Sequence, residues 1–233
     1  MTDVHWQTPA RQPLAPPRAE RHPSDVDGWT TRPDATRWRA FVVLGLGLDL
    51  LFLVVYGGAN ALAAGRSSHL VLHAPWERDI PLVPWMVLPY LSVGLLAMLP
   101  PFALGPRALR RLARRIALAT LAAGAVFVLA PATLGFARVI PEGTFAPVFA
   151  LIHQLDHPHN LVPSLHVAYT VILTGALLAA TEARAGRRVL VGWSIAVYLS
   201  TVLVHQHHLL DVLGGLLLGR LLMLLPSPGG ELR

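Results

Sequence analysis

Six stretches of the chain are almost entirely apolar, and each has or approaches the length of a membrane-spanning helix. They cover residues 40–65, 83–104, 116–136, 163–182, 189–206 and 209–226. A helix needs about 20 mostly apolar residues to cross roughly 30 Å of hydrocarbon. The pattern therefore predicts an all-α polytopic membrane protein in which six transmembrane helices form a bundle. The last two stretches are short and adjoin each other, so their limits are the least sharply marked.

Polar segments flank this predicted membrane domain of residues 40–226. Residues 1–39 are rich in Pro and Arg and lack apolar periodicity, which predicts a disordered cytoplasmic tail. Residues 227–233 form a short C-terminal tail. The first apolar stretch is longer than the ~7–15-residue core of a signal peptide, so we expect it to remain as a transmembrane helix.

The arginines predict the orientation of the chain. They gather in the N-terminal tail and in the segments 107–115 and 184–188, which the positive-inside rule assigns to the cytoplasm. Arg66, Arg78 and Arg138 fall in segments assigned to the outside. Both termini are therefore expected in the cytoplasm, and the cell (inner) membrane is the expected location. The outer face then receives residues 66–82, 137–162 and the turn 205–208.

Composition limits the class of protein further. The chain is 54% hydrophobic and only 14% charged, against about 25% charged in soluble domains. The calculated pI of about 10.9 would suit a nucleic-acid binder. Because the arginines lie between apolar stretches, we expect them to contact anionic lipid headgroups, and we expect no nucleic-acid partner. The absence of Cys excludes disulfides, thiolate metal ligands and a cysteine nucleophile.

Residues with catalytic potential concentrate at the predicted outer face. The 40 residues between His166 and His207 suffice for one helix inward and one helix back, so both histidines return to that face. His207 and Asp211 are four apart and share a helix side, where the carboxylate can hold one imidazole nitrogen protonated and leave the other as a nucleophile. Ser164 resembles a helix N-cap, and the N–H groups behind it form an anion site. His166, beside that site, can protonate a departing alkoxide near neutral pH.

These residues resemble two motifs of the type 2 phosphatidic acid phosphatase superfamily, over roughly residues 79–219. The matching residues are Pro163, Ser164 and His166 in one motif, and Ser200, His207 and Asp211 in the other. The resemblance implies a membrane-embedded lipid phosphate phosphatase or phosphotransferase that needs no metal or cofactor and forms a phosphohistidine. It implies His207 as nucleophile, Asp211 as its partner and His166 as general acid.

Two departures from the family concern phosphate-binding cations. The first motif of the family begins with Lys, which this chain lacks, and Thr201 replaces the Arg of the last motif. The segment 79–92 looks like the inositol phosphorylceramide synthase branch, whose members also replace that Arg and pass the phospho group to an alcohol. We therefore expect Arg138, where the first motif would fall, to hold the phosphate, with Arg78 second. The other expected substrate contacts are Ser164, Ser200 and Asn160.

Other readings of the chain stay open. The outer face is rich in histidine, at positions 153, 157, 159, 205 and 208, which faintly resembles the boxes of membrane di-iron oxidoreductases. A metal site would leave Pro163, Ser164 and Asp211 unexplained. A non-catalytic lipid-binding protein or a lipid transporter is another alternative. Asp49, inside the first apolar stretch, has either a functional role or a helix-packing hydrogen bond, and Gly215 and Gly219 predict close helix contact.

Overall fold

The computed structural model describes residues 27–156 and 159–226. Within these residues every element is a helix, apart from an isolated bridge between Leu70 and Ala132. The predicted all-α class is therefore confirmed. Most of the predicted N-terminal tail, the C-terminal tail and His157 lie outside the described residues.

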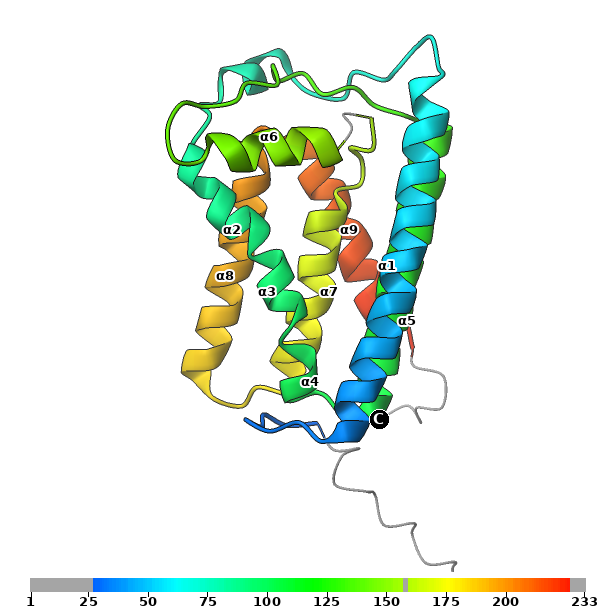
Figure 1. Ribbon diagram of the computed structural model, residues 1–233, viewed down its shortest axis with the longest axis vertical. Helices are drawn as coiled ribbons and strands as arrows, with labels where there is room; N and C mark the ends of the chain where they lie inside the picture. The colour runs from blue at the N-terminus through cyan, green and yellow to red at the C-terminus, as the bar shows by residue number, and fades with distance from the viewer. Residues whose placement is uncertain (1–26, 157–158, 227–233) are drawn as a thin grey trace, which may run out of the picture.

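The helices form an upright bundle that α6 crosses at one end (Figure 1). The long helices are α1 (Ala35–Ala64), α5 (Pro106–Leu129), α7 (Leu165–Ala179), α8 (Arg184–Leu203) and α9 (Leu209–Leu224), and the crossing helix is α6 (Ala146–Leu155). Short pieces join α1 to α5, namely η2 (Pro75–Asp79), η3 (Pro84–Met86), α2 (Val87–Leu91), α3 (Val93–Ala97) and α4 (Pro100–Ala103). Each of the six predicted stretches thus contains helical structure.

Local sequence explains where the helices differ from the predicted ranges. The second stretch is broken into short pieces because Pro84, Pro89 and Pro100 cannot donate a backbone hydrogen bond. α5 begins at Pro106 rather than 116, because Pro suits the first helical position and Arg is a good helix former. α1 begins at Ala35 rather than 40, since Asp34 caps it by accepting a backbone N–H at 2.8 Å.

Among the described helices, α1 and α5 are long and apolar enough to cross a membrane. α7 and α9 have 15 and 16 residues, fewer than the ~20 that a span requires. α8 has 20 residues, but three of its first five are Arg. The predicted number of six spans is therefore not confirmed.

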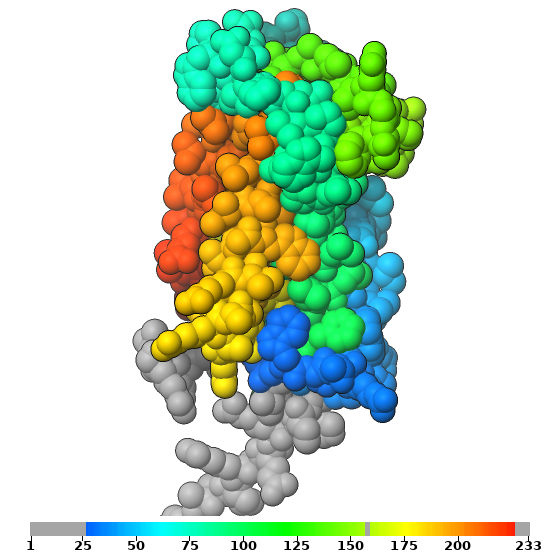
Figure 2. Space-filling view, turned by 90° about the vertical axis from the view of Figure 1, so that its left-hand side faces the viewer, coloured from blue at the N-terminus to red at the C-terminus, as the bar shows by residue number. Residues whose placement is uncertain are grey.

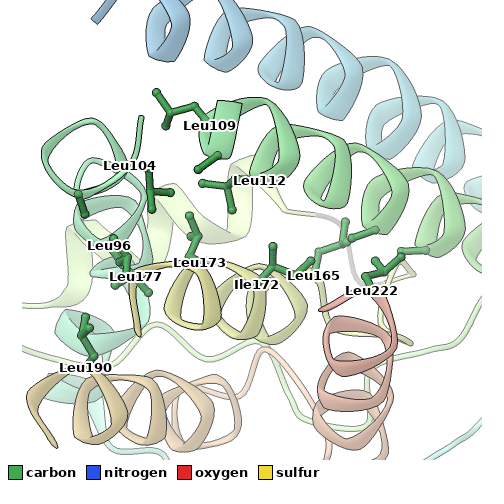
Figure 3. Packing of buried hydrophobic residues seen from close by; sticks show 14 of the residues in the cluster. Leu96, Leu104, Leu109, Leu112, Leu165, Ile172, Leu173, Leu177, Leu190 and Leu222 are labelled. Atoms are coloured by element: carbon green, nitrogen blue, oxygen red, sulfur yellow. The ribbon is translucent and has the colours of Figure 1, made fainter. Parts of the chain in front are cut away.

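α7 is the centre of the bundle, with contacts to α3, α4, α5, α8 and α9. Its residues Ile172, Leu173 and Leu177 are buried among leucines of the surrounding elements (Figure 3). The approach of α9 is close, because a Cβ on Gly215 would lie 2.5 Å from the carbonyl oxygen of Ser164. A Cβ on Gly219 would lie within 3.0 Å of α7. The predicted close contact at these two glycines is confirmed.

The described start of the chain is held against the end of the bundle opposite α6, beside α4 and the start of α8 (Figure 2). The N–H of Gly28 donates to the carbonyl of Ala103 at 2.7 Å, and the indole N–H of Trp29 donates to the hydroxyl of Thr181 at 2.8 Å. Residues 27–39 are therefore ordered, in contrast to the predicted disordered tail.

Candidate active site

His207 and Asp211 form a buried pair where α8 passes into α9. Oδ2 of Asp211 accepts the backbone N–H of His208 at 2.8 Å and lies 3.2 Å from Nδ1 of His207. Only 7% of His207 and 1% of Asp211 is exposed. The carboxylate favours a proton on Nδ1, so Nε2 of the neutral ring keeps a free lone pair. The four-residue spacing thus brings the two side chains together as the sequence predicted.

The turn before α9 holds the backbone of His207 in place. The carbonyl of Thr201 accepts the N–H groups of Gln206 and His207 at 3.1 and 3.0 Å. His205 adopts a φ of 57°, a conformation uncommon for residues other than Gly, and its ring nitrogen lies 2.9 Å from the carbonyl oxygen of Ile80. These contacts anchor the turn to both α8 and the segment before α2.

Ser164 caps α7 and joins it to α9. Its hydroxyl accepts a backbone N–H of the first turn at 3.4 Å, as predicted, and its own N–H donates to the carbonyl of Asp211 at 3.0 Å. This link places His166, on the first turn of α7, beside the α8–α9 turn. The ring of His166 stacks on Tyr90 with centroids 4.1 Å apart. Its Nε2 is buried and has no hydrogen-bond partner in the described part of the chain.

His166 and His207 line one cavity of about 700 Å³, which α1, α2, α6 and α7 enclose with the segment before α7. The other polar or titratable side chains on its wall are Tyr56, Asn60, Tyr90, Asp156, His159, Asn160 and Tyr169. The remaining wall is apolar. The cavity lies toward the end of the bundle that α6 crosses (Figure 1).

Polar contacts tie α1 to the opposite wall of this cavity. The side-chain N–H of Asn160 donates to the carbonyl of Tyr56 at 3.0 Å, and the Tyr56 hydroxyl donates to Asp156. Oδ1 of Asn160 and Oδ1 of Asn60 are buried and accept no hydrogen bond from any described residue. Both residues belong to the cavity wall, and these two oxygens are turned away from the open space. The predicted substrate contact Asn160 lies on this wall.

The other predicted substrate contacts lie away from the cavity wall. The Ser200 hydroxyl is buried and donates to the carbonyl of Val197 within α8 at 2.7 Å. Nη1 of Arg138 donates to the carbonyl of His153 at 3.0 Å, so α6 holds this guanidinium. Arg78 is exposed on η2. The structure does not bring either arginine into the cavity, and it likewise leaves Ser164 behind the wall as a cap.

Glu77 is a buried carboxylate of this face that the sequence pattern did not mark, and only 4% of it is exposed. Its two oxygens accept the N–H of Ala74 at 2.9 Å and the N–H of Leu209, the first residue of α9, at 2.8 Å. Oε2 also lies 3.4 Å from Nδ1 of His208, at an angle that is not that of a hydrogen bond. Glu77 therefore connects η2 to the start of α9.

The ring of His208 lies between two other rings. Its centroid is 4.3 Å from that of His73 and 4.3 Å from that of Phe136, which also stacks on His205 at 4.0 Å. Nε2 of His208 accepts the N–H of Gly135 at 3.0 Å, so the proton of the neutral ring is on Nδ1. Burial lowers the pKa of His208 and so does His73, outweighing two carboxylates that raise it. The ring is thus kept neutral, as its acceptor role requires.

The histidines of this face pair mainly with other rings. In the described part of the chain, no three His, Asp or Glu side chains converge as metal ligands would. No known protein family matches the chain, and neither curated proteins nor solved structures gave a match. What the fold and the site define is a helical bundle with an imidazole–carboxylate pair and a second imidazole on one cavity.

Proposed function

We propose that this chain is an integral membrane enzyme that transfers the phosphoryl group of a lipid phosphate through a phosphohistidine at His207. The observation that carries the proposal is the arrangement of three side chains. Asp211 lies behind His207, and His166 shares the wall of the same cavity. The resemblance to type 2 phosphatidic acid phosphatases, which rests on the same residues, implies the same roles.

The three side chains suffice for a balanced two-step reaction. Nε2 of His207 attacks phosphorus, and the N–P bond forms as the P–O bond to the lipid breaks. Asp211 stabilises the positive charge that develops on the ring, while His166, which takes up a proton when the phosphate anion binds beside it, gives that proton to the leaving alkoxide. Water or an alcohol then attacks phosphorus and the P–N bond breaks. Its proton passes to His166, which restores the starting state.

Helix ends supply part of the stabilisation that a phosphoryl group needs. No Arg lies on the described wall of the cavity. α7 begins on the cavity wall, where Leu165 and His166 lie, and the N-terminus of a helix carries free N–H groups and a partial positive charge. Hydrogen-bond donors aimed at developing charge commonly contribute more to such catalysis than any other single effect. The start of α7 therefore supports a phosphate site without a guanidinium.

The distribution of Arg supports the proposed membrane orientation. The Arg-rich starts of α5 and α8 lie at the same end of the bundle as the described ends of the chain (Figure 1). The cavity lies toward the other end. Under the positive-inside rule, the Arg-rich end faces the cytoplasm and the cavity faces outward. In this orientation α1, α5, α7, α8, α9 and the broken series α2 to α4 make six crossings.

An alcohol is favoured over water as the acceptor. A cavity of about 700 Å³ has far more room than a water nucleophile needs. Asn60, Asn160 and Asp156 line it with amide or carboxylate groups, and hydroxyl compounds are partners that such groups can hydrogen-bond. We therefore propose phosphotransfer to a hydroxyl compound as the second form of the same activity.

The test uses the purified full-length protein with a panel of glycerolipid, sphingolipid and prenyl phosphates. Free phosphate and transferred phosphoryl group are both followed, and ³²P on protein is trapped by rapid quenching at alkaline pH. We expect His207→Ala to abolish the label and to lower turnover by at least about 10²-fold. The matched control is His153→Ala, a histidine of the same face that does not line the cavity. Turnover of His207→Ala equal to that of the control would refute the assignment.

A further inference from the structure

A second cavity, of about 470 Å³, lies between α1, α3, α4, α5 and α7. Its lining is apolar except for Asp49 and Tyr169, and the Tyr169 hydroxyl is already bonded to Thr120 at 2.7 Å. Phe52, Val93 and Tyr169 line this cavity and the candidate active site alike. The two spaces therefore adjoin, and we call the second one the α1 groove.

Asp49 is an isolated, exposed carboxyl group on the open side of this groove. It lies at the middle of α1, which runs from Ala35 to Ala64 and is the most apolar membrane-capable helix described. No described residue forms a hydrogen bond or an ion pair with it. An ionisable side chain at the centre of a membrane helix is costly unless it has a partner. Since the described protein supplies none, the partner must come from a ligand or from another helix.

We propose that the α1 groove binds a long-chain amphiphile that carries a hydrogen-bond donor, a hydroxyl or an amine, and that Asp49 pairs with that donor. The apolar lining from Phe41 to Phe52 follows α1 for about 17 Å, which suits a hydrocarbon chain. An ionised carboxylate pairs with an amine, and either form of the group accepts from a hydroxyl.

The position of Asp49 sets the depth of the donor group. Asp49 precedes Phe52 by three residues, which is about 4.5 Å along the helix axis. Because Phe52 is shared with the active-site cavity, the paired group lies about one helical turn from the space that His166 and His207 line. The inference rests on the proposed function only in placing the groove within a bilayer. Pairing of Asp49 with α1 of a second copy is the competing arrangement.

Two glycines of α1 provide a matched pair of variants. Gly45 lines the groove and Gly47 does not, while a Cβ at either position meets no atom within 4 Å. Both Gly45→Leu and Gly47→Leu are therefore expected to fold, but only the first fills the groove. Asp49→Leu removes the acceptor and keeps a side chain of similar size. His207→Ala tests the active site separately.

The probes are C16 chains with a diazirine near the middle, ending in a primary alcohol, a primary amine or a methyl ether. Each is photolysed with the full-length protein in phosphatidylcholine nanodiscs, and labelled peptides are mapped by mass spectrometry. We expect the alcohol or the amine to label α1 and α5 saturably, with affinity reduced at least about tenfold by Asp49→Leu and by Gly45→Leu. Gly47→Leu and His207→Ala should label like wild type.

Three results would overturn the inference. One is labelling by the methyl ether as strong as by both donor probes. Another is wild-type affinity in Asp49→Leu. The third is a loss of self-association in Asp49→Leu, measured by cross-linking of the nanodisc protein, which would assign the carboxyl to a helix interface. Binding to the α1 groove is measured by labelling, whereas phosphotransfer is measured by turnover. If the protein shows no phosphotransfer, the labelling experiment still tests the groove independently.

Discussion

Removal of the Glu77 carboxylate should strongly destabilise the end of the bundle that α6 crosses. Its oxygens accept two backbone N–H groups, one of them on the first residue of α9, and face His208. A buried N–H left without its acceptor costs about 1–3 kcal/mol, and both of these hydrogen bonds are part-buried. We expect Glu77→Ala to lower the free energy of unfolding by about 2–4 kcal/mol. Glu77→Gln keeps one acceptor for Leu209 and should lose about half as much.

The measurement is thermal unfolding of the purified protein in one detergent at fixed concentration. For a chain of this size, 1 kcal/mol corresponds to about 2–4 °C in Tm, so Glu77→Ala should unfold about 5–15 °C below wild type. The matched control is Glu142→Ala, because Glu142 is exposed on the same face and should change Tm by little.

Activity gives a second reading of the same variants. Glu77 acts on the α9 start that carries Asp211, so its loss should lower kcat and the yield of trapped phosphohistidine more than it raises KM. A Tm for Glu77→Ala within about 1 °C of the control would show that the carboxylate does not anchor α9. If Glu77→Ala and Glu77→Gln lowered Tm equally, the hydrogen bond to the N–H of Leu209 would not be the source of the stability.

Two further predictions concern packing and pH. Gly215→Ala puts a Cβ 2.5 Å from the carbonyl oxygen of Ser164 and should lower the free energy of unfolding by about 1–3 kcal/mol. Gly192→Ala, which has open space on α8, is the control and should be neutral or stabilising. Equal shifts in Tm for the two variants would contradict this prediction. Because the folded state lowers the pKa of His208, the unfolded chain binds its proton first, and stability should fall as pH drops below about 6.5. His208→Gln should flatten that decline between pH 7.5 and 5, and an unchanged slope would refute the assignment to His208.

Much of the fold was predictable because it depends on local patterns. Apolar stretches marked the helices, the residues before α7 marked the Ser164 cap, and a spacing of four marked the contact of His207 with Asp211. The limits of α1 and α5 were predicted less well. Arg is a good helix former, so both helices already begin within the Arg-containing segments that precede the apolar stretches.

The rest of the candidate site depends on contacts between distant parts of the chain. Glu77 meets Leu209 across 132 positions, and no local pattern distinguishes it from an exposed acid. Asn60 and Tyr90 lie in apolar stretches with no local pattern that marks a site, and the packing of α1 and α2 places both on the cavity wall. Arg138 was expected to hold phosphate from its position along the chain. Its Nη1 donates to the carbonyl of His153, a contact that only the placement of α6 determines, and its buried Nε has no partner among the described residues.

The helices that line the two cavities differ in how many neighbouring helices they pack against. α7 carries His166 and touches most of the bundle, so changes along it disturb many neighbours. α1 lines both cavities, yet it packs mainly against α5 at the edge of the bundle. Apart from Tyr56, which bonds to Asp156 and Asn160, residues on its inner side have few ties to the elements that carry the histidines. Substitutions along α1 can therefore reshape both cavities while leaving the most heavily packed helix of the bundle undisturbed.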